Sequence, residues 1–435
     1  MKILVLTRSS WDDTNSTGNT MSNFWAGWDP DNIANIYCRS SAPNNNVCKL
    51  YYSLSEKDLF LSIFNRKFSA GNVFSWDNLS QNTIAVDRVF INEDRLYGFF
   101  RKNSFTIALW LRELLWGVGR WKNNKLRKFL NDFKPDAIFA TSFSATYPHS
   151  VIWYLKEVTN AKVILFHADD CLTVKGLGGS PLARLKREIS ARTVKESAKK
   201  ADLNYCISPR QQQEYTVKLG KEMRLLYKGD DFKDNPPLKE VAEKIRIVYI
   251  GSILYGRWKT IGILARAIKN INIKKSVYEL VIYSQYKPSK KEMKAMVIDG
   301  ASCFLGKVPS EQIPQIFSDA DIVLHVESFE NRERNETRLS FSTKIVDCLH
   351  SGRCLLAIGW EEAASIDYLK KNDAALVATN ENEIIGLLTN IANNPSIISE
   401  YSQKAWNCGK KNHQLDDIRK NLYKDIHDVV VGSNK

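Results

Sequence analysis

The chain has 435 residues, of which 44% are hydrophobic, and its formal net charge at pH 7 is +14. This length exceeds one ordinary hydrophobic core and the composition excludes a disordered chain, so we expect two or three domains. The charge predicts an anionic partner, which leaves open a nucleic acid, an acidic membrane surface or a phosphorylated small molecule.

The eight cysteines contain no C-x-x-C pair, and the six histidines show no H-x-x-x-H spacing. We therefore expect reduced thiols, no structural zinc and a cytoplasmic protein. Residues 1–8 are an apolar run of strand length, too short for the core of a signal peptide or for a membrane span.

Residues 2–7 (KILVLT) predict a buried parallel strand, followed by a polar loop over 9–20 and a helix from about residue 21. Many nucleotide and sugar sites begin with a strand, a glycine loop and a helix. Gly18 and Asn19 in this loop are therefore candidates for binding a nucleotide or a sugar. A plain connecting loop is the equal alternative.

Residues 105–121 predict an amphipathic helix, since apolar residues recur at helical spacing and charged residues interrupt any membrane span. Packing in the core is its expected use, and aromatic contacts with a membrane surface are the alternative. The apolar positions are Ile107, Trp110, Leu111, Leu114, Leu115, Val118 and Trp121. A helix over 126–133 and a strand over 137–141 follow, with Pro135 between them.

The next predicted strand, 163–166, ends at His167, Asp169 and Asp170. Ligands of open α/β sheets bind beyond the carboxyl ends of the strands, so these residues are candidates for acceptor binding, and His167 for proton transfer or acceptor orientation. The alternative is that one aspartate only caps the loop that follows.

A basic helix is predicted over 182–200, ahead of a strand over 203–207. Four cations on one side of it would dock flat on an anionic leaflet, whereas the alternative is an ordinary solvated helix. The cations are Arg184, Arg192, Lys195 and Lys199, beside a weakly apolar strip of Ala191, Val194 and Ala198.

A charged linker over 233–244, with Pro236 and Pro237, precedes a second alternation of strands and helices. Strands are expected at 245–250, 278–283, 302–305, 322–326 and 354–358, a helix at 259–269 and a final helical region at 397–430. Two βα series predict an α/β chain with two Rossmann-like domains. We place them at 1–235 and 236–400, with a helical segment over 401–435 crossing back.

Two cations follow the first strand of the second domain, in the loop over 251–258 and at the start of the next helix. Arg257 is suited to a bidentate clamp on a phosphate, and together with a helix amino end it would neutralise a diphosphate without a metal ion. Lys259 is expected either to be a second cation on the diphosphate or to be a solvated residue at the helix start.

Ser342 is the expected N-cap of a short helix that ends near Gly352. Lys344 in its first turn opposes the helix dipole at a cost of about 0.3–1 kcal/mol unless an anion lies there. Asp347 lies on the same side of the helix. This pattern predicts a ligand with a phosphate and hydroxyls, and the alternative is a plain surface helix.

Asp29-Pro30-Asp31 and Asp319-Ala320-Asp321 match the D-x-D spelling of metal-dependent sugar transferases. Turn chemistry explains the first, and the second ends a helix before a strand. We expect no metal site at either and no cofactor.

Residues 251–259 (GSILYGRWK) and 340–359 (SFSTKIVDCLHSGRCLLAIG) together resemble the donor half of GT-B glycosyltransferases, most like family 4. Residues 133–136 and 228–231 extend the resemblance at low stringency to nearly the whole chain. It implies an acceptor-binding N-terminal domain, a C-terminal domain that binds a nucleotide-sugar, and metal-independent transfer with retention.

By this resemblance, Arg257 and Lys344 correspond to the basic residues that stabilise the donor diphosphate, and Asp347 to the second glutamate of E-x7-E, which contacts the ribose. The donor would also meet the loop and helix start formed by Gly251, Ser252, Lys259, Ser342 and Thr343.

Leu339 stands where the first glutamate of that motif is expected, so the contact to the transferred sugar must differ. Glu327, Glu330 and Glu336 are nearby candidates. Related sequences without that glutamate resemble bacterial capsule, O-antigen and exopolysaccharide transferases.

The expected function is transfer of a sugar from a nucleotide-sugar to a glycan or lipid-linked acceptor, by a protein peripheral on the inner face of the cell membrane. The alternatives are a nucleotide-sugar epimerase of GT-B shape and a non-catalytic partner subunit, which Leu339 favours. Nucleic-acid binding is disfavoured because the charges are dispersed and no recognition motif is present.

Overall fold

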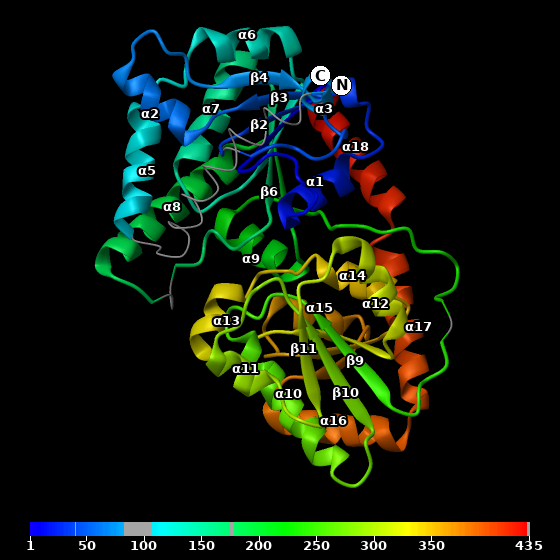
Figure 1. The fold of residues 1–435 in the computed structure, drawn as a ribbon. Coiled ribbons are helices and arrows are strands. Elements are labelled where there is room, and N and C mark those ends of the chain that lie inside the picture. Colours follow the sequence, from blue (N-terminus) through cyan, green and yellow to red (C-terminus); the bar gives the residue numbers. More distant parts are fainter. Residues whose placement is uncertain (40, 82–105, 175–177, 238, 433–435) are drawn as a thin grey trace. The chain divides into compact units, whose positions relative to one another are not determined.

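The structure, a computed structural model, describes residues 1–39, 41–81, 106–174, 178–237 and 239–432. These residues form two compact units. Unit 1 contains Met1–Ile207, Gln212–Leu226 and the stretch from Arg419, whereas unit 2 contains Ser208–Gln211 and Tyr227–Ile418. Each unit is built on its own largely parallel sheet with helices packed on it (Figure 1), which confirms the predicted α/β class.

The sheet of unit 1 has the order β4-β3-β2-β1-β5-β6-β7-β8, and its strand pairs are parallel except β3 with β4. The order reverses at β1, whose neighbours are β2 and β5, so the topological switch point lies there. The strands are β1 (Ile3–Thr7), β2 (Ile33–Tyr37), β3 (Leu50–Ser53), β4 (Asn72–Ser75), β5 (Ala137–Thr141), β6 (Lys162–His167), β7 (Leu203–Cys206) and β8 (Arg224–Leu225).

The helices of unit 1 follow the apolar periodicity of the sequence, and their bounds differ from the expected ones mostly by a few residues. They are α1 (Ser16–Trp25), η1 (Pro30–Asn32), α2 (Glu56–Phe64), α3 (Trp76–Gln81), α5 (Thr106–Val118), α6 (Asn124–Phe133), α7 (Tyr147–Thr159), α8 (Pro181–Lys200), α9 (Pro209–Leu219) and α18 (Leu415–Val431), of which α9 and α18 begin in unit 2. Residue 105, the expected start of α5, lies outside the described residues.

The sheet of unit 2 is parallel throughout its described pairs, in the order β11-β10-β9-β12-β13-β14. Its switch point lies between β9 and β12, so the loops after these two strands are the expected ligand position. The strands are β9 (Ile245–Ile250), β10 (Tyr278–Tyr283), β11 (Ser302–Gly306), β12 (Ile322–Val326), β13 (Cys354–Ile358) and β14 (Leu376–Ala378).

Helices cover both faces of this sheet, and the apolar residues of the strands and of α10, α16 and α17 form one buried core. The helices are α10 (Arg257–Asn272), α11 (Lys290–Met296), η2 (Ser310–Gln312), α12 (Ile313–Asp319), α13 (Asn331–Thr337), α14 (Lys344–His350), α15 (Ala364–Lys371), α16 (Glu381–Asn393) and α17 (Ser396–Asn412).

The final helical region is two helices and not one, because the chain breaks between α17 and α18 at His413. This side chain is fully buried. Its Nδ1 lies 3.1 Å from the Lys228 carbonyl oxygen and its Nε2 lies 2.9 Å from the Tyr368 hydroxyl. Periodicity does not reveal such a break, since the bonds that hold it join residues far apart in the sequence.

Candidate functional site

Arg257 lies at the switch point of the unit 2 sheet and is anchored to the end of β12. Its Nη2 lies 3.0 Å from both carboxylate oxygens of Glu327, and its Nε donates to the Val326 carbonyl at 3.0 Å. Glu327 is 1% exposed. The Nη1 group has no hydrogen-bond partner among the described residues, so the guanidinium is held firmly on one side and retains donors on another.

The position of Arg257 corrects one expectation, because this residue begins α10 and does not lie in the loop before it. Gly256 has φ +72°, in the left-handed region, and a Cβ there would lie 2.5 Å from Ser328 Oγ. The chain therefore turns into the helix at Gly256, where only glycine fits without strain.

Lys344 is the first residue of α14, and its Nζ lies 3.4 Å from the Ile250 carbonyl oxygen at the end of β9. It is half-buried and forms no ion pair with a described carboxylate. Burial lowers the pKa of Lys344; Asp347 partly offsets this, while the charges of Arg257 and Lys228 lower the pKa further. An anion bound here would relieve both the desolvation and the repulsion between cations.

The start of α14 differs from the expected one. The N-cap is Thr343 and not Ser342, and no side chain caps the helix. Instead, the Ser342 carbonyl accepts from the Ile345 N–H at 3.0 Å and the Thr343 carbonyl from the Val346 N–H at 3.3 Å. Such i→i+3 bonds tighten the first turn. The donor-binding roles of Ser342 and Thr343 stay predictions.

Asp347 forms an ion pair that the sequence analysis missed. The Lys228 Nζ lies 2.6 Å from its Oδ1, and the two residues are 119 positions apart. Lys228 lies in the stretch 228–231 that carries part of the family resemblance, which is the only signal that could have pointed to it. The pair fixes the orientation of the Asp347 carboxylate beside Lys344, and the predicted ribose contact is compatible with it.

The loop between β9 and α10 is fixed by Tyr249. Its hydroxyl donates to the Ser252 carbonyl at 2.7 Å. A Cβ on Gly251 would lie 2.6 Å from the hydroxyl oxygen, so glycine is needed for this close approach. Lys259 differs from Arg257, because it pairs with Glu330 at 2.7 Å and both side chains are more than a third exposed. This is the environment of a solvated residue at a helix start.

Leu339 is fully buried and contacts no solvent. Of the three nearby glutamates, Glu327 pairs with Arg257, Glu330 with Lys259, and Glu336 lies 3.9 Å from Arg332. Glu327 alone combines burial with a place at the carboxyl end of a central strand. The sequence signal for Glu327 is its position directly after the apolar strand β12.

In unit 1, Gly18 and Asn19 belong to α1 and not to a loop. The helix begins at Ser16, five residues before the expected start, because the Asn15 side chain accepts from the Gly18 N–H at 2.9 Å. A Cβ on Gly18 would lie 2.0 Å from the Asp12 carbonyl oxygen, so this glycine is explained by packing. Asn19 is exposed.

His167 ends β6 and is fully buried. Its Nε2 lies 3.2 Å from Asn204 Oδ1, and burial lowers its pKa to about 4. Asp170 accepts from the Leu172 and Thr173 N–H groups at 3.1 Å. Asp170 therefore caps the loop that follows β6, which is the alternative given in the sequence analysis. Asp169 is exposed. The acceptor-binding roles of these three residues stay predictions.

The two D-x-D spellings are used in local structure. Asp321 accepts from the Arg246 N–H at 2.8 Å and from Lys239 Nζ at 2.6 Å. Asp29 caps η1 through the Asp31 N–H at 3.0 Å. Within the described ranges, no three His, Cys, Asp or Glu side chains are grouped as a metal site requires.

The face of α8 that was predicted to dock on an anionic membrane is only partly exposed to solvent. Its cations are exposed, but Val194 and Ala198 of the adjacent strip are fully buried, so that part of the strip packs inside the unit and cannot dock on a membrane. Among the described helices, none has the length and apolar composition that a membrane crossing requires.

Comparison with known proteins agrees with this geometry. Residues 244–394, which carry Arg257, Glu327, Lys344 and Asp347, match the family model described as glycosyl transferases group 1. No curated protein sequence matches the chain.

Three solved structures are similar over nearly their full lengths. HepE of Anabaena, in complex with UDP-glucose, is 11% identical with a TM-score of 0.62, covering 98% of this chain and 99% of that one. The sucrose-phosphate synthase of Thermosynechococcus elongatus is 11% identical with a TM-score of 0.63, covering 99% and 100%. WaaG, a glycosyltransferase involved in lipopolysaccharide biosynthesis, is 11% identical with a TM-score of 0.56, covering 99% and 100%. The chain therefore has the GT-B fold, and its residues 244–394 are similar to the group 1 glycosyltransferase domain.

Proposed function

We propose that this protein transfers a hexosyl group from a nucleotide-sugar to a glycan or lipid-linked acceptor, with retention of configuration and without a metal ion. One observation carries the proposal: Lys344 is a half-buried cation that forms no ion pair with a described carboxylate, and the charges of Arg257 and Lys228 are close enough to repel it, although Asp347 offsets part of this. An uncompensated buried charge is costly, and a donor diphosphate would supply the missing anion.

The proposed chemistry uses the two cations on the leaving group. The bond between the sugar and the diphosphate oxygen breaks, and Lys344 Nζ and Arg257 Nη1 stabilise the negative charge that develops on that oxygen. The acceptor hydroxyl attacks from the same face, forms the new glycosidic bond and passes its proton to the departing phosphate oxygen. Glu327 acts as a positioning residue, since it holds the Arg257 guanidinium.

The relatives support the substrate classes. The HepE structure contains UDP-glucose, and WaaG is described as acting in lipopolysaccharide biosynthesis. These proteins suggest a uridine diphosphate donor and a role in bacterial surface polysaccharide synthesis, with the protein peripheral on the inner face of the membrane. Leu339 is buried, so we assign the sugar contact elsewhere.

The test is slow hydrolysis of a panel of UDP-, GDP- and dTDP-sugars by the purified chain in excess chelator. We expect one nucleotide class to be hydrolysed, with release of free sugar and nucleoside diphosphate. Release of an epimerised sugar would support the epimerase alternative. Hydrolysis lost in chelator and restored by manganese or magnesium would contradict the metal-free mechanism and bring both D-x-D spellings, at 29–31 and at 319–321, back as candidate metal ligands.

A further inference from the structure

Helices α2 and α5 of unit 1 lie side by side and contact each other (Figure 1). Both expose large apolar side chains. On α5, four of the five exposed apolar residues recur at positions i, i+4, i+7 and i+11, which is one stripe along the helix, and Leu109 (39% exposed) lies off it. The α2–α5 face is formed by Phe60 (55% exposed), Leu61 (40%), Phe64 (74%), Ile107 (63%), Leu111 (60%), Leu114 (61%) and Val118 (54%).

This face is larger than the single exposed apolar residues that soluble domains normally carry. The opposite side of α5 already faces the unit, since Trp116 is 3% exposed. Helix α5 has apolar residues on both sides, and only the side with Trp116 packs in the core. The other side is left exposed. Helix α8, which also contacts α5, adds Leu182, Leu185 and Ile189, all more than a third exposed.

The acidic side chains of the two helices are engaged within the unit. Glu56 Oε1 lies 2.6 Å from Arg112 Nε, and Glu113 Oε1 lies 3.2 Å from Lys186 Nζ. Asp58, the third carboxylate of α2 and α5, is buried and accepts from Asn72 at 3.2 Å. The face therefore presents little negative charge to solvent.

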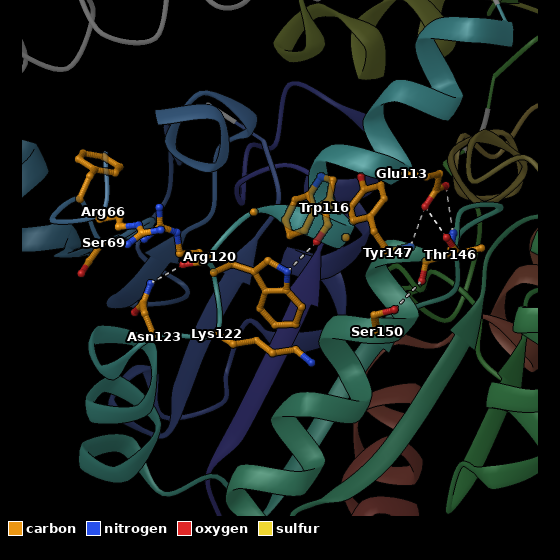
Figure 2. A pocket seen from close by; sticks show the side chains of 14 residues that line it. Arg66, Ser69, Glu113, Trp116, Arg120, Lys122, Asn123, Thr146, Tyr147 and Ser150 are labelled. Carbon is orange, nitrogen blue, oxygen red and sulfur yellow. Dashed lines mark hydrogen bonds between the residues drawn. The ribbon is translucent and has the colours of Figure 1, made fainter. Parts of the chain in front are cut away.

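A cavity of about 600 Å³ lies where the carboxyl ends of α2 and α5 meet (Figure 2). Arg66, Arg120 and Lys122 line it, are exposed, and form no ion pair with a described carboxylate. Arg120 Nη2 donates to the Ile63 carbonyl at 3.1 Å, and Lys122 Nζ lies 5.3 Å from the Trp121 ring centroid. Arg120 and Lys122 are thus partly fixed without an ion pair, and Glu113, the carboxylate that also lines the cavity, is paired with Lys186.

We propose that the α2–α5 face docks on an anionic phospholipid bilayer, with Arg66, Arg120 and Lys122 binding headgroup phosphates at the cavity. Apolar side chains flanked by uncompensated cations are typical of interfacial membrane surfaces. A protein partner fits less well, since it would need carboxylates placed opposite these three cations, whereas an anionic bilayer presents phosphates over its whole surface. The inference rests on the peripheral location within the proposed function and on no step of sugar transfer.

The test is cosedimentation of the full chain with vesicles of phosphatidylcholine, with and without phosphatidylglycerol, in the absence of donor and acceptor. We expect binding only to the anionic vesicles and its loss at high salt. The variant R66E/R120E/K122E should bind at least about tenfold more weakly. F64S/L114S should also bind more weakly.

Two matched controls separate a specific surface from general charge. R192E/K195E/K199E changes the same charge on the far part of α8, and V217S removes an apolar side chain that is 80% exposed. Both should bind nearly as the wild type does. Donor hydrolysis without vesicles should be unchanged in all four variants, so failure of docking is distinguishable from failure of the proposed chemistry.

Three results would overturn the inference. Equal losses in the two triple variants would mean long-range attraction or docking through α8. Inorganic phosphate that releases the chain from vesicles as well as high salt does, with F64S/L114S unaffected, would mean a phosphate site alone. A concentration-dependent dimer that F64S/L114S abolishes would mean that a second copy covers the face.

Discussion

Replacing Arg257 by alanine is expected to lower donor turnover by roughly ten- to thousand-fold, the range for one lost charge stabiliser. The same change should lower the free energy of unfolding by about 3–5 kcal/mol, because it leaves Glu327 buried without its partner. Single-turnover kinetics and urea denaturation measure the two effects separately.

A second substitution distinguishes the two roles. Arg257→Ala combined with Glu327→Gln removes the unpaired buried charge, so it should recover much of the stability while turnover stays low. If the double variant regained turnover as well, Arg257 would act only through folding, and the proposed contact with the diphosphate would be wrong.

Lys344→Ala should lower turnover over the same range but should not destabilise the unliganded chain. It removes a half-buried cation from the positive end of α14, so stability should hold or rise by a few tenths of a kcal/mol. Lys290→Ala is the matched control, since Lys290 is an exposed first residue of α11. A Lys344→Ala chain that unfolds easily yet turns over normally would make this lysine structural.

The free energy of unfolding should fall steeply as pH falls from about 6.5 to about 4. Burial lowers the pKa of His149, His167, His325 and His413 to about 4. Below the ordinary value of 6.5 the unfolded chain therefore binds more protons than the folded chain, so acid favours unfolding. The stabilisation is fully present above pH 6.5 and is lost as pH falls through about 4. The contribution is at most about 3 kcal/mol per histidine.

Urea denaturation at a series of pH values checks this prediction. Each unit contains two of the four histidines, so both should lose stability in the same range. A free energy of unfolding that is constant between pH 6.5 and 4.5 would contradict the neutral, buried state of these side chains.

The strands of unit 2 could be predicted to the residue where an apolar run is bounded by turn residues. This holds for β9, β10, β12 and β13, which are central or nearly central strands with both faces covered. Arg257 and Lys344 could also be singled out. Arg257 follows the apolar strand β9. Lys344 opposes the dipole of α14, and no residue close to it in the sequence explains a cation there.

The partners of these residues could not be predicted. Glu327 and Arg257 are 70 positions apart, and Lys228 and Asp347 are 119 apart, so only the fold brings them together. The orientation of α5 was the other difficulty. Its periodicity predicts a helix, but with apolar residues on both sides the pattern does not say which side packs in the core.

The most direct test of the account is a calorimetric titration of UDP into the wild-type chain and into Lys344→Ala, both in excess chelator. The account predicts that the wild type binds UDP without a metal ion and that the variant binds at least about tenfold more weakly, as expected when a charged contact to a phosphate is lost. Equal affinity of the two chains, or binding by the wild type only after a divalent metal is added, would contradict it.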